Sequence, residues 1–170
     1  MVKNIVLIGM PGTGKTTVGQ EISKMTGLKF VDTDDLLKAR CQMVLKNFVA
    51  EKGTEAFFEL QRRVICEINY ENLVIATGGG VVMDNDTMTH LRKIGDIVYL
   101  NTPIDVLEKR LDPNRRLARN VGESFRDVFN KRQPLYEKYS DSIIDCRGKD
   151  VSQVTKEIYE IIKARSKKQC

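Results

Sequence analysis

The sequence predicts an α/β domain built around a parallel sheet. Short, unbroken apolar runs alternate along the chain with longer stretches of helical period. Strands that are buried on both faces read as such runs, and their alternation with helices is typical of parallel sheets. A glycine-rich turn also joins the first apolar run to the first helix. No linker rich in Pro, Gly or Ser divides the 170 residues, so we expect a single domain over residues 1–170.

Local patterns place the individual elements. Apolar residues recur at helical spacing in the stretch 15–26 and again in 54–70, and Gly27 is suited to end the first of these helices. Gly53 interrupts the stretch before the second helix, and residues 43–52 are helical or irregular. The expected strands are 3–8, 28–31, 73–77, 96–100 and 142–145, and the expected helices are 15–26, one ending near 40, 54–70, 85–93, 103–111, 122–138 and 151–164, with a frayed tail over 166–170.

The stretch Gly9–Thr16 reads G-x-x-x-x-G-K-T and directly follows the first apolar run. Successive backbone N–H groups in such a loop can surround a phosphate, and the following helix N-terminus favours negative charge. Lys15 can then reach the β- and γ-phosphates, and the Thr16 hydroxyl can bind Mg²⁺. A dinucleotide fingerprint would need a further glycine at position 17, where Thr17 stands, so we reject that alternative.

Two carboxylates follow the second expected strand. Asp32 and Asp34 are two residues apart, so both point to the same side of a strand end. This arrangement suggests one contact to Mg²⁺ and one to a substrate hydroxyl. Simple capping of the next helix by Asp32 or Thr33 is the alternative, and the two roles can coexist.

Three glycines, Gly78, Gly79 and Gly80, follow the third expected strand. Glycines at the carboxyl end of a core strand leave room for a ligand to contact the backbone. A flexible turn is the alternative. A flexible turn is usually more polar, so we favour a ligand-binding loop.

The positive charge of the chain is concentrated in one window. The net charge is +5, and residues 109–132 hold eight basic and three acidic residues, which also sum to +5. A nucleic-acid surface, a flap of arginines over a polyphosphate and a solvated basic face all fit this pattern. Only Phe125 and Phe129 lie among these basic residues as stacking aromatics, so a nucleic-acid partner is the less favoured reading.

The remaining composition indicates an ordinary globular protein. No apolar run approaches the length of a membrane span, and no signal peptide is evident. The four cysteines are widely spaced without a C-x-x-C pair, which favours reduced thiols and a cytoplasmic location.

Taken together, the motifs resemble those of shikimate kinases, which are small P-loop kinases of the nucleoside-monophosphate-kinase type. The phosphate loop, Asp32-Thr33-Asp34, Thr77–Gly80, the loop around Arg115 and Arg132-x-Pro134-x-Tyr136 occur in the order and spacing of that family. The resemblance implies a three-layer P-loop kinase fold with a five-stranded parallel sheet in the order 2-3-1-4-5. It also implies ATP-dependent phosphorylation of the alcohol group of shikimate to shikimate 3-phosphate in aromatic amino-acid biosynthesis.

The resemblance further implies roles for individual residues. Lys15, Asp34 and Arg115 would be catalytic, with Asp34 orienting the attacking hydroxyl and Arg115 closing from a lid over residues 112–123. Mg²⁺ would be held by Thr16 and Asp32. ATP would be bound by Gly12, Thr13, Gly14, Lys15, Thr16, Thr17, Arg110, Arg115 and Arg147, the last near the adenine. The acceptor would be bound by Asp34, Gly78, Gly79, Gly80 and Arg132, with helices over residues 33–61 forming the acceptor-binding part.

One departure from the family concerns the acceptor site. Phe58 stands where these kinases usually have an arginine that clamps the carboxylate, and Gln61 replaces the glutamate that orients that arginine. Arg62 and Arg63, one turn further on, are candidates to compensate, but a helix places neither of them at the position of residue 58. The lid reads Arg115-Arg116-Leu117-Ala118 where Arg-Pro-Leu-Leu is usual. We therefore expect either a raised KM for shikimate or a different small acceptor in its place.

Two other functions remain open on the sequence. One is a related P-loop kinase that acts on a gluconate-like acceptor or a nucleotide. The other is a non-catalytic nucleotide-binding protein, for which the basic window 109–132 is the support. The architecture predicts a monomer.

Overall fold

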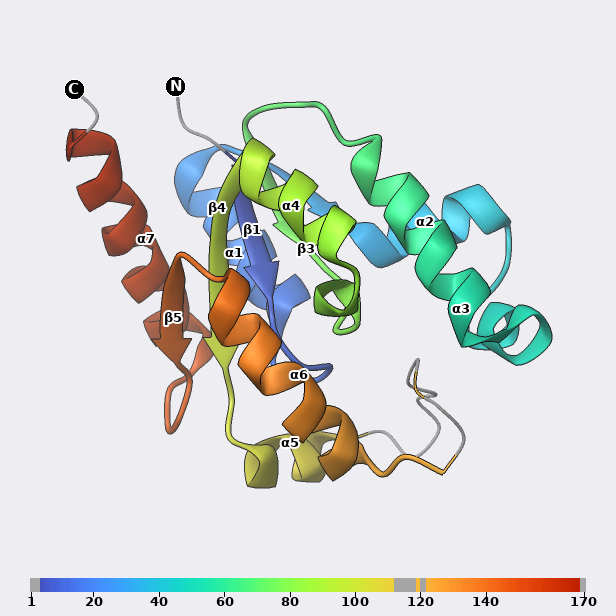
Figure 1. Ribbon diagram of the computed structural model, residues 1–170. Helices are drawn as coiled ribbons and strands as arrows, with labels where there is room; N and C mark the ends of the chain where they lie inside the picture. The colour runs from blue at the N-terminus through green and yellow to red at the C-terminus, as the bar shows by residue number, and fades with distance from the viewer. Residues whose placement is uncertain (1–3, 112–118, 120–121, 169–170) are drawn as a thin grey trace.

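The computed structural model describes residues 4–111, 119 and 122–168, and within them a single parallel sheet carries helices on both faces (Figure 1). The strand order is β2-β3-β1-β4-β5, which confirms the order that the resemblance implied. The strands are β1 (Asn4–Ile8), β2 (Lys29–Asp32), β3 (Leu73–Ala76), β4 (Gly95–Asn101) and β5 (Ser142–Asp145).

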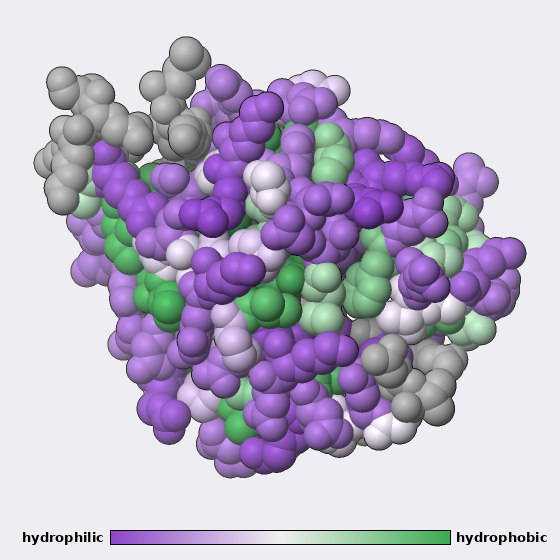
Figure 2. All heavy atoms as spheres, in the orientation of Figure 1, coloured by the Kyte–Doolittle hydropathy of each residue, from purple (hydrophilic) through white to green (hydrophobic). Residues whose placement is uncertain are grey.

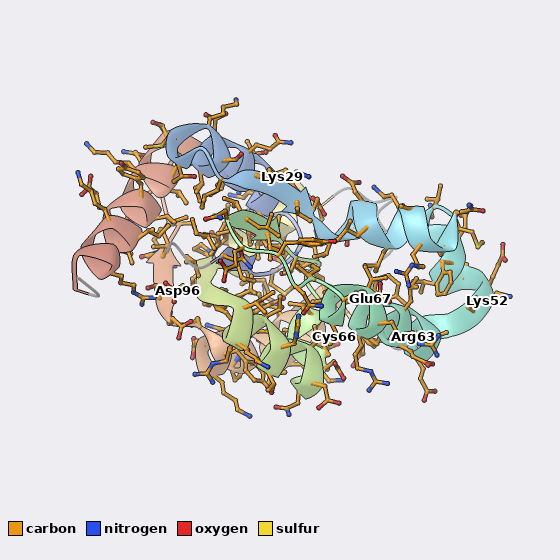
Figure 3. The ribbon with its side chains drawn as sticks, turned by 90° about the horizontal axis from the view of Figure 1, so that it is seen from above. Lys29, Lys52, Arg63, Cys66, Glu67 and Asp96 are labelled. Atoms are coloured by element: carbon orange, nitrogen blue, oxygen red, sulfur yellow. The ribbon has the colours of Figure 1, made fainter. Side chains whose placement is uncertain are left out.

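Seven α-helices and one 3₁₀-helix connect the strands within the described residues. They are α1 (Lys15–Thr26), α2 (Thr33–Cys41), α3 (Leu45–Cys66), the 3₁₀-helix η1 (Val81–Met83), α4 (Asn85–Ile94), α5 (Ile104–Arg110), α6 (Phe125–Tyr139) and α7 (Val151–Lys168). Seen from above, α2 and α3 project from the sheet on the β2 side, and Lys52, next to the non-helical Gly53 within α3, lies at the outer edge of this projection (Figure 3).

Two hydrophobic clusters make the sheet the middle layer of three. Leu7 on β1 packs with Val18 and Ile22 of α1, and α7 joins the same cluster. On the opposite face, Val6 packs with residues of α3, α4 and α6, including Ile65. Successive residues of β1 thus face opposite layers, which is why the strand reads as an unbroken apolar run. The outer surface in the view of Figure 2 is largely hydrophilic, with apolar side chains in small groups.

Parallel pairing brings the functional loops to one edge of the sheet. β1 pairs with β3 so that Leu7 is level with Ala76, and β2 pairs with β3 so that Asp32 is level with Ala76. The carboxyl ends of β1, β2 and β3 therefore lie together. The loops that follow them, with the glycines, carboxylates and Gly78–Gly80 of the sequence analysis, meet at this edge.

Several element boundaries differ from the sequence prediction. Residues 45–52 are helical and continuous with the predicted helix 54–70, although Gly53 has a non-helical φ of 87° and ψ of 169°, and the helix ends at Cys66. The 3₁₀-helix η1 was not predicted. Helix α6 begins at Phe125, not at 122, because Ser124 and Asp127 form a capping box there. The predicted frayed tail is helical up to Lys168.

Within the described residues, no helix combines the length and apolar character that crossing a membrane requires. The predicted lid over 112–123 falls mostly on residues 112–118 and 120–121, which lie outside the described part of the chain. The lid, and the division of the domain into an acceptor-binding part and a lid, therefore remain predictions.

Candidate active site

The phosphate loop is bent by three glycines. Gly9, Gly12 and Gly14 have φ angles of 149°, 89° and 87°, a region that side chains disfavour. Gly9 is also tightly packed, since a Cβ there would lie 2.8 Å from the Leu100 carbonyl oxygen. Helix α1 begins at Lys15 with no side-chain cap, so its first backbone N–H groups face the loop and are suited to bind an anion.

Lys15 is held at the same loop. Its side chain is buried, and Nζ donates to the carbonyl oxygens of Gly9 at 2.7 Å and Met10 at 2.9 Å. The ammonium group is thus fixed against the loop backbone. This places a positive charge beside the surface that would bind phosphate.

Thr16 and Asp32 come together across the loop. The Thr16 hydroxyl donates to Asp32 Oδ2 at 2.8 Å, while Asp32 Oδ1 accepts from the Asp34 backbone N–H at 2.9 Å and caps α2. The capping alternative is therefore confirmed, and the second oxygen still faces Thr16. A hydroxyl and a carboxylate suit Mg²⁺, which prefers few protein oxygens plus water and phosphate. No group of three or more His, Cys, Asp or Glu in the described ranges could hold a metal by itself.

The triple-glycine segment is closely packed. The Gly78 N–H donates to Thr33 Oγ1 at 3.2 Å. A Cβ on Gly79 would lie 2.5 Å from Pro11 Cδ, and a Cβ on Gly80 would lie 2.7 Å from Phe58 Cε1. Close approach to neighbours therefore explains glycine at 79 and 80, and the flexible-turn alternative does not fit. The contact with Pro11 joins this segment directly to the phosphate loop.

Tyr136 also links the two loops, a role that the sequence reasoning missed. Its hydroxyl donates to the Gly79 carbonyl and contacts Met10 Sδ at 3.7 Å, and its ring stacks on Tyr99 with centroids 5.0 Å apart. Burial raises the pKa of Tyr136 well above its usual value, so the hydroxyl remains a donor. The sequence signal that could have indicated this role is the spacing of Tyr136 from Arg132, because residues four apart lie on the same face of a helix.

The acceptor side gathers side chains from α2, α3 and α6. Arg132 is only 4% exposed, and its Nη2 lies 3.5 Å from the point where a Gly80 Cβ would be. Asp34 Oδ1 and Gln61 Oε1 lie 3.1 and 3.3 Å from the corresponding point at Gly78. The predicted acceptor residues are therefore brought together, and Gln61 and Phe58 lie among them.

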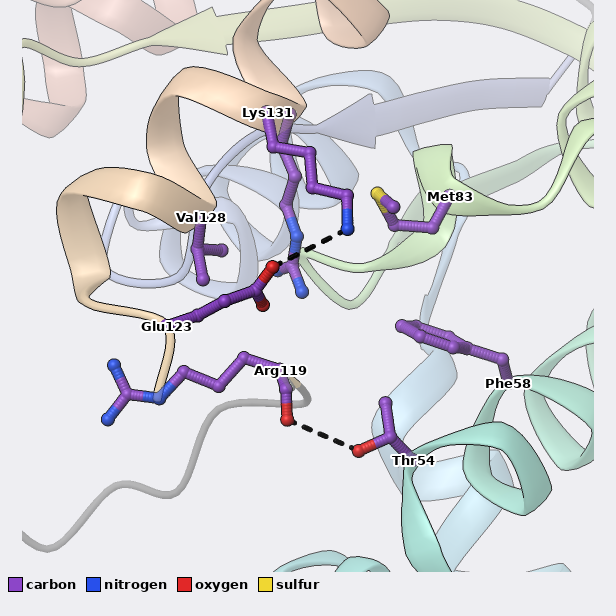
Figure 4. Close-up of a pocket in the computed structure, with 8 residues that line it drawn as sticks. Thr54, Phe58, Met83, Arg119, Glu123, Val128 and Lys131 are labelled. Atoms are coloured by element: carbon purple, nitrogen blue, oxygen red, sulfur yellow. Dashed lines mark hydrogen bonds and ion pairs between the residues drawn. The ribbon is translucent and has the colours of Figure 1, made fainter. Parts of the chain in front are cut away.

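A small pocket of about 60 Å³ opens beside Phe58 and Arg132 (Figure 4). Basic side chains predominate over acidic ones in its described lining. The lining residues are Thr54, Phe58, Met83, Arg119, Glu123, Val128, Lys131 and Arg132.

Three arginines were predicted to bind ATP from the lid or beside the adenine, and the structure places them differently. Arg110 Nη1 donates to the Gly12 carbonyl at 3.3 Å, so it lies against the phosphate loop. Arg147 lies in the turn after β5, where its backbone N–H donates to Asp145 at 3.0 Å, and its described hydrogen bonds do not reach the phosphate loop. Arg115 lies outside the described residues.

Comparison with known proteins identifies the family. The shikimate kinase family model matches residues 11–163. A shikimate kinase from Sulfurihydrogenibium sp. is 35% identical over 166 residues, covering 96% of this chain and 99% of that protein. The shikimate kinase of Francisella philomiragia is 34% identical over 162 residues, covering 92% of each chain. The structure of Acinetobacter baumannii shikimate kinase in complex with shikimate matches with a TM-score of 0.87 and 26% identity, covering 97% of this chain and 95% of that one. The chain belongs to the shikimate kinase family.

Proposed function

We propose that this protein transfers the γ-phosphoryl group of ATP to a ring hydroxyl of shikimate, with Mg²⁺ as the metal ion. The observation that carries the proposal is the meeting of three loops at one sheet edge. There Lys15 lies on the phosphate loop, the Thr16–Asp32 pair lies beside it, and Asp34 lies at Gly78. Family membership, and a relative whose structure contains shikimate, support the choice of acceptor.

In the proposed reaction, the acceptor oxygen forms a bond to the γ-phosphorus as the bond to the β–γ bridging oxygen breaks, and ADP leaves. Asp34 orients the acceptor hydroxyl and takes its proton. Lys15 and the loop N–H groups stabilise the charge on the phosphoryl oxygens. Thr16 and Asp32 are the residues that would hold Mg²⁺, which when bound supplies positive charge between the phosphates.

Arg132 binds the acceptor carboxylate in this scheme, because a buried guanidinium is suited to a fixed, paired anion. Arg110 and Arg147 are proposed to flank the adenine, and Arg115 to approach the phosphates from the lid. A monomeric, cytoplasmic enzyme acting in aromatic amino-acid biosynthesis fits the same proposal.

A coupled assay of ADP formation with ATP, Mg²⁺ and shikimate tests this function. We expect ADP formation that depends on shikimate and that falls by roughly 10²–10³-fold in Lys15→Met, because a positioned charge at the transferring group is lost. ADP formation that ignores shikimate but responds to gluconate or a nucleotide would favour the related-kinase alternative. ATP binding with no acceptor-dependent turnover would favour the non-catalytic one.

A further inference from the structure

On the α3 side of the proposed acceptor site, the residues at positions 58 and 61 are uncharged: Phe58 lines the pocket, and Gln61 lies beside Gly78. The Phe58 ring occupies the space next to Gly80, with Cε1 2.7 Å from the point where a Gly80 Cβ would lie. Gln61 is 1% exposed, and its Nε2 has no hydrogen-bond partner among the residues that the structure describes. A lone glutamate at position 61 would be a buried charge without the arginine that usually pairs with it, so Phe58 and Gln61 are compatible as a neutral pair.

The next two arginines of α3 do not replace the missing cation. Arg62 lies 3.8 Å from both Asp84 and Asp86, and Arg63 is paired with Glu59 on its own helix. The Arg63 side chain is 69% exposed. Neither arginine lines the pocket beside Phe58. As helix geometry predicts, neither arginine takes the place of residue 58, so neither compensates for the missing cation.

Helix α6 supplies cations from the opposite wall. Arg132 lies beside Gly80, and its neighbour Lys131 lines the same pocket across from Phe58 (Figure 4). Arg119 is the other basic residue in the described lining, but Figure 4 shows its guanidinium directed away from Phe58. Lys131 is thus the described cation that faces Phe58 together with Arg132.

The present ion pair of Lys131 is weak enough for a bound ligand to replace it. Its Nζ lies 3.5 Å from Glu123 Oε1, and the Lys131 side chain is 48% exposed. An ion pair this exposed is weak, and a lysine stem has several rotatable bonds. A carboxylate that entered beside Arg132 could therefore share or replace Glu123 as the partner of Lys131.

We propose that Lys131 is a specificity-determining residue that binds the acceptor carboxylate together with Arg132, opposite the uncharged wall of Phe58 and Gln61. This inference rests on the proposed function, since it assumes a carboxylated acceptor such as shikimate. The carboxylate is then held by two cations of one helix, instead of by one cation on each side of the pocket.

The test compares shikimate with its carboxamide, which keeps the ring and removes the negative charge. In Lys131→Met we expect the KM for shikimate to rise about tenfold, the effect of losing one charged hydrogen bond, and the KM for the carboxamide to change less than about twofold. Lys138→Met, at an exposed lysine two turns beyond Lys131 on the same face of α6, is the matched control and should change neither KM. An equal rise for both acceptors, or no rise for either, would overturn the proposal.

A second variant separates a lost contact from a damaged fold. Adding Phe58→Arg and Gln61→Glu to Lys131→Met should restore a cation on α3 and return the KM for shikimate to near the wild-type value. Failure of this rescue in a triple variant with wild-type thermal stability would contradict the proposal.

Failure of the proposed function can be recognised separately. If the wild type binds ATP but phosphorylates neither acceptor, the kinase function is wrong, and calorimetry with shikimate alone then decides the inference. Weaker shikimate binding by Lys131→Met than by wild type supports the Lys131 contact. Equal binding by the two proteins, or no binding by the wild type, rejects it.

Discussion

The phosphate loop and the acceptor pocket are adjacent but are built differently. In the phosphate loop, conformation depends on glycine φ angles and on Lys15 bonded to the carbonyls of Gly9 and Met10. On the acceptor side, the surface is formed by individual side chains such as Phe58 and Arg132, and Gln61, beside Gly78, has a buried amide N–H without a partner among the described residues. The loop that we propose binds the triphosphate is therefore shaped by backbone geometry, while the proposed acceptor site can change by substitution of a few side chains.

The largest effect on activity is expected from a change at the contact between the Gly78–Gly80 segment and the phosphate loop. Gly79→Ala places a Cβ 2.5 Å from Pro11 Cδ of the phosphate loop, so one loop must move. We expect kcat/KM for shikimate to fall by roughly 100-fold, the order of effect of a displacement near 1 Å at a reacting group. Steady-state kinetics measure this, and calorimetry should show ATP binding retained.

Gly78→Ala is the matched comparison for Gly79→Ala. Its Cβ would meet only the ends of the Asp34 and Gln61 side chains, at 3.1 and 3.3 Å. If Gly78→Ala lost as much kcat/KM as Gly79→Ala, displacement of Asp34 or general disruption of the segment would account for the effect as well as contact with the phosphate loop does.

Tyr136→Phe should have the next largest effect. It leaves the half-buried Gly79 carbonyl without the Tyr136 hydroxyl, so we expect the free energy of unfolding to fall by about 1 kcal/mol. We also expect kcat/KM for shikimate to fall more than the affinity for ATP, because the hydrogen bond is made to the acceptor loop. Denaturant unfolding and kinetics measure the two effects. Equal losses for both substrates would contradict a role in placing that loop.

Gln61→Leu examines the incomplete hydrogen bonding of the acceptor pocket. Leucine removes a buried amide whose Nε2 lacks a partner, at similar volume, so we expect the free energy of unfolding to rise by about 1 kcal/mol. Thr16→Val is the contrasting change in the phosphate loop, since it breaks the hydrogen bond to Asp32. A stability loss in Gln61→Leu would show that the amide is satisfied in solution.

The smallest effect concerns the start of α6, the helix that carries Arg132 and Tyr136. Hydrogen bonds from the Ser124 hydroxyl and backbone N–H lower the pKa of Asp127 from its ordinary value. Because the folded pKa is lowered, the stabilisation is complete above the ordinary carboxyl pKa and is lost as pH falls through the folded value. Asp127→Asn should therefore lower Tm slightly at pH 7 and make little difference at strongly acidic pH. A difference in Tm that does not change with pH would contradict this.

The sequence predicted the regular part of the fold because its signals are local. Five apolar runs gave the strands, and the glycine spacing in Gly9–Thr16 gave the phosphate loop. The capping box at Ser124 and Asp127 was also a local signal, but it was not used to place the start of α6.

The features that were not predicted depend on contacts between distant segments. The hydrogen bond from Tyr136 to Gly79 connects residues 57 positions apart, and the pocket beside Arg132 is lined by Lys131 of α6 and Phe58 of α3. No local pattern specifies such pairs. The role assigned to Arg115 remains a prediction, because that residue lies outside the described part of the chain.

Product analysis by ³¹P NMR is the most direct test of the account. Purified protein is incubated with ATP, Mg²⁺ and shikimate until ADP accumulates. The account predicts a phosphate ester on a ring carbon of shikimate in amounts equal to the ADP formed. Inorganic phosphate in place of the ester, or no loss of ATP, would contradict it.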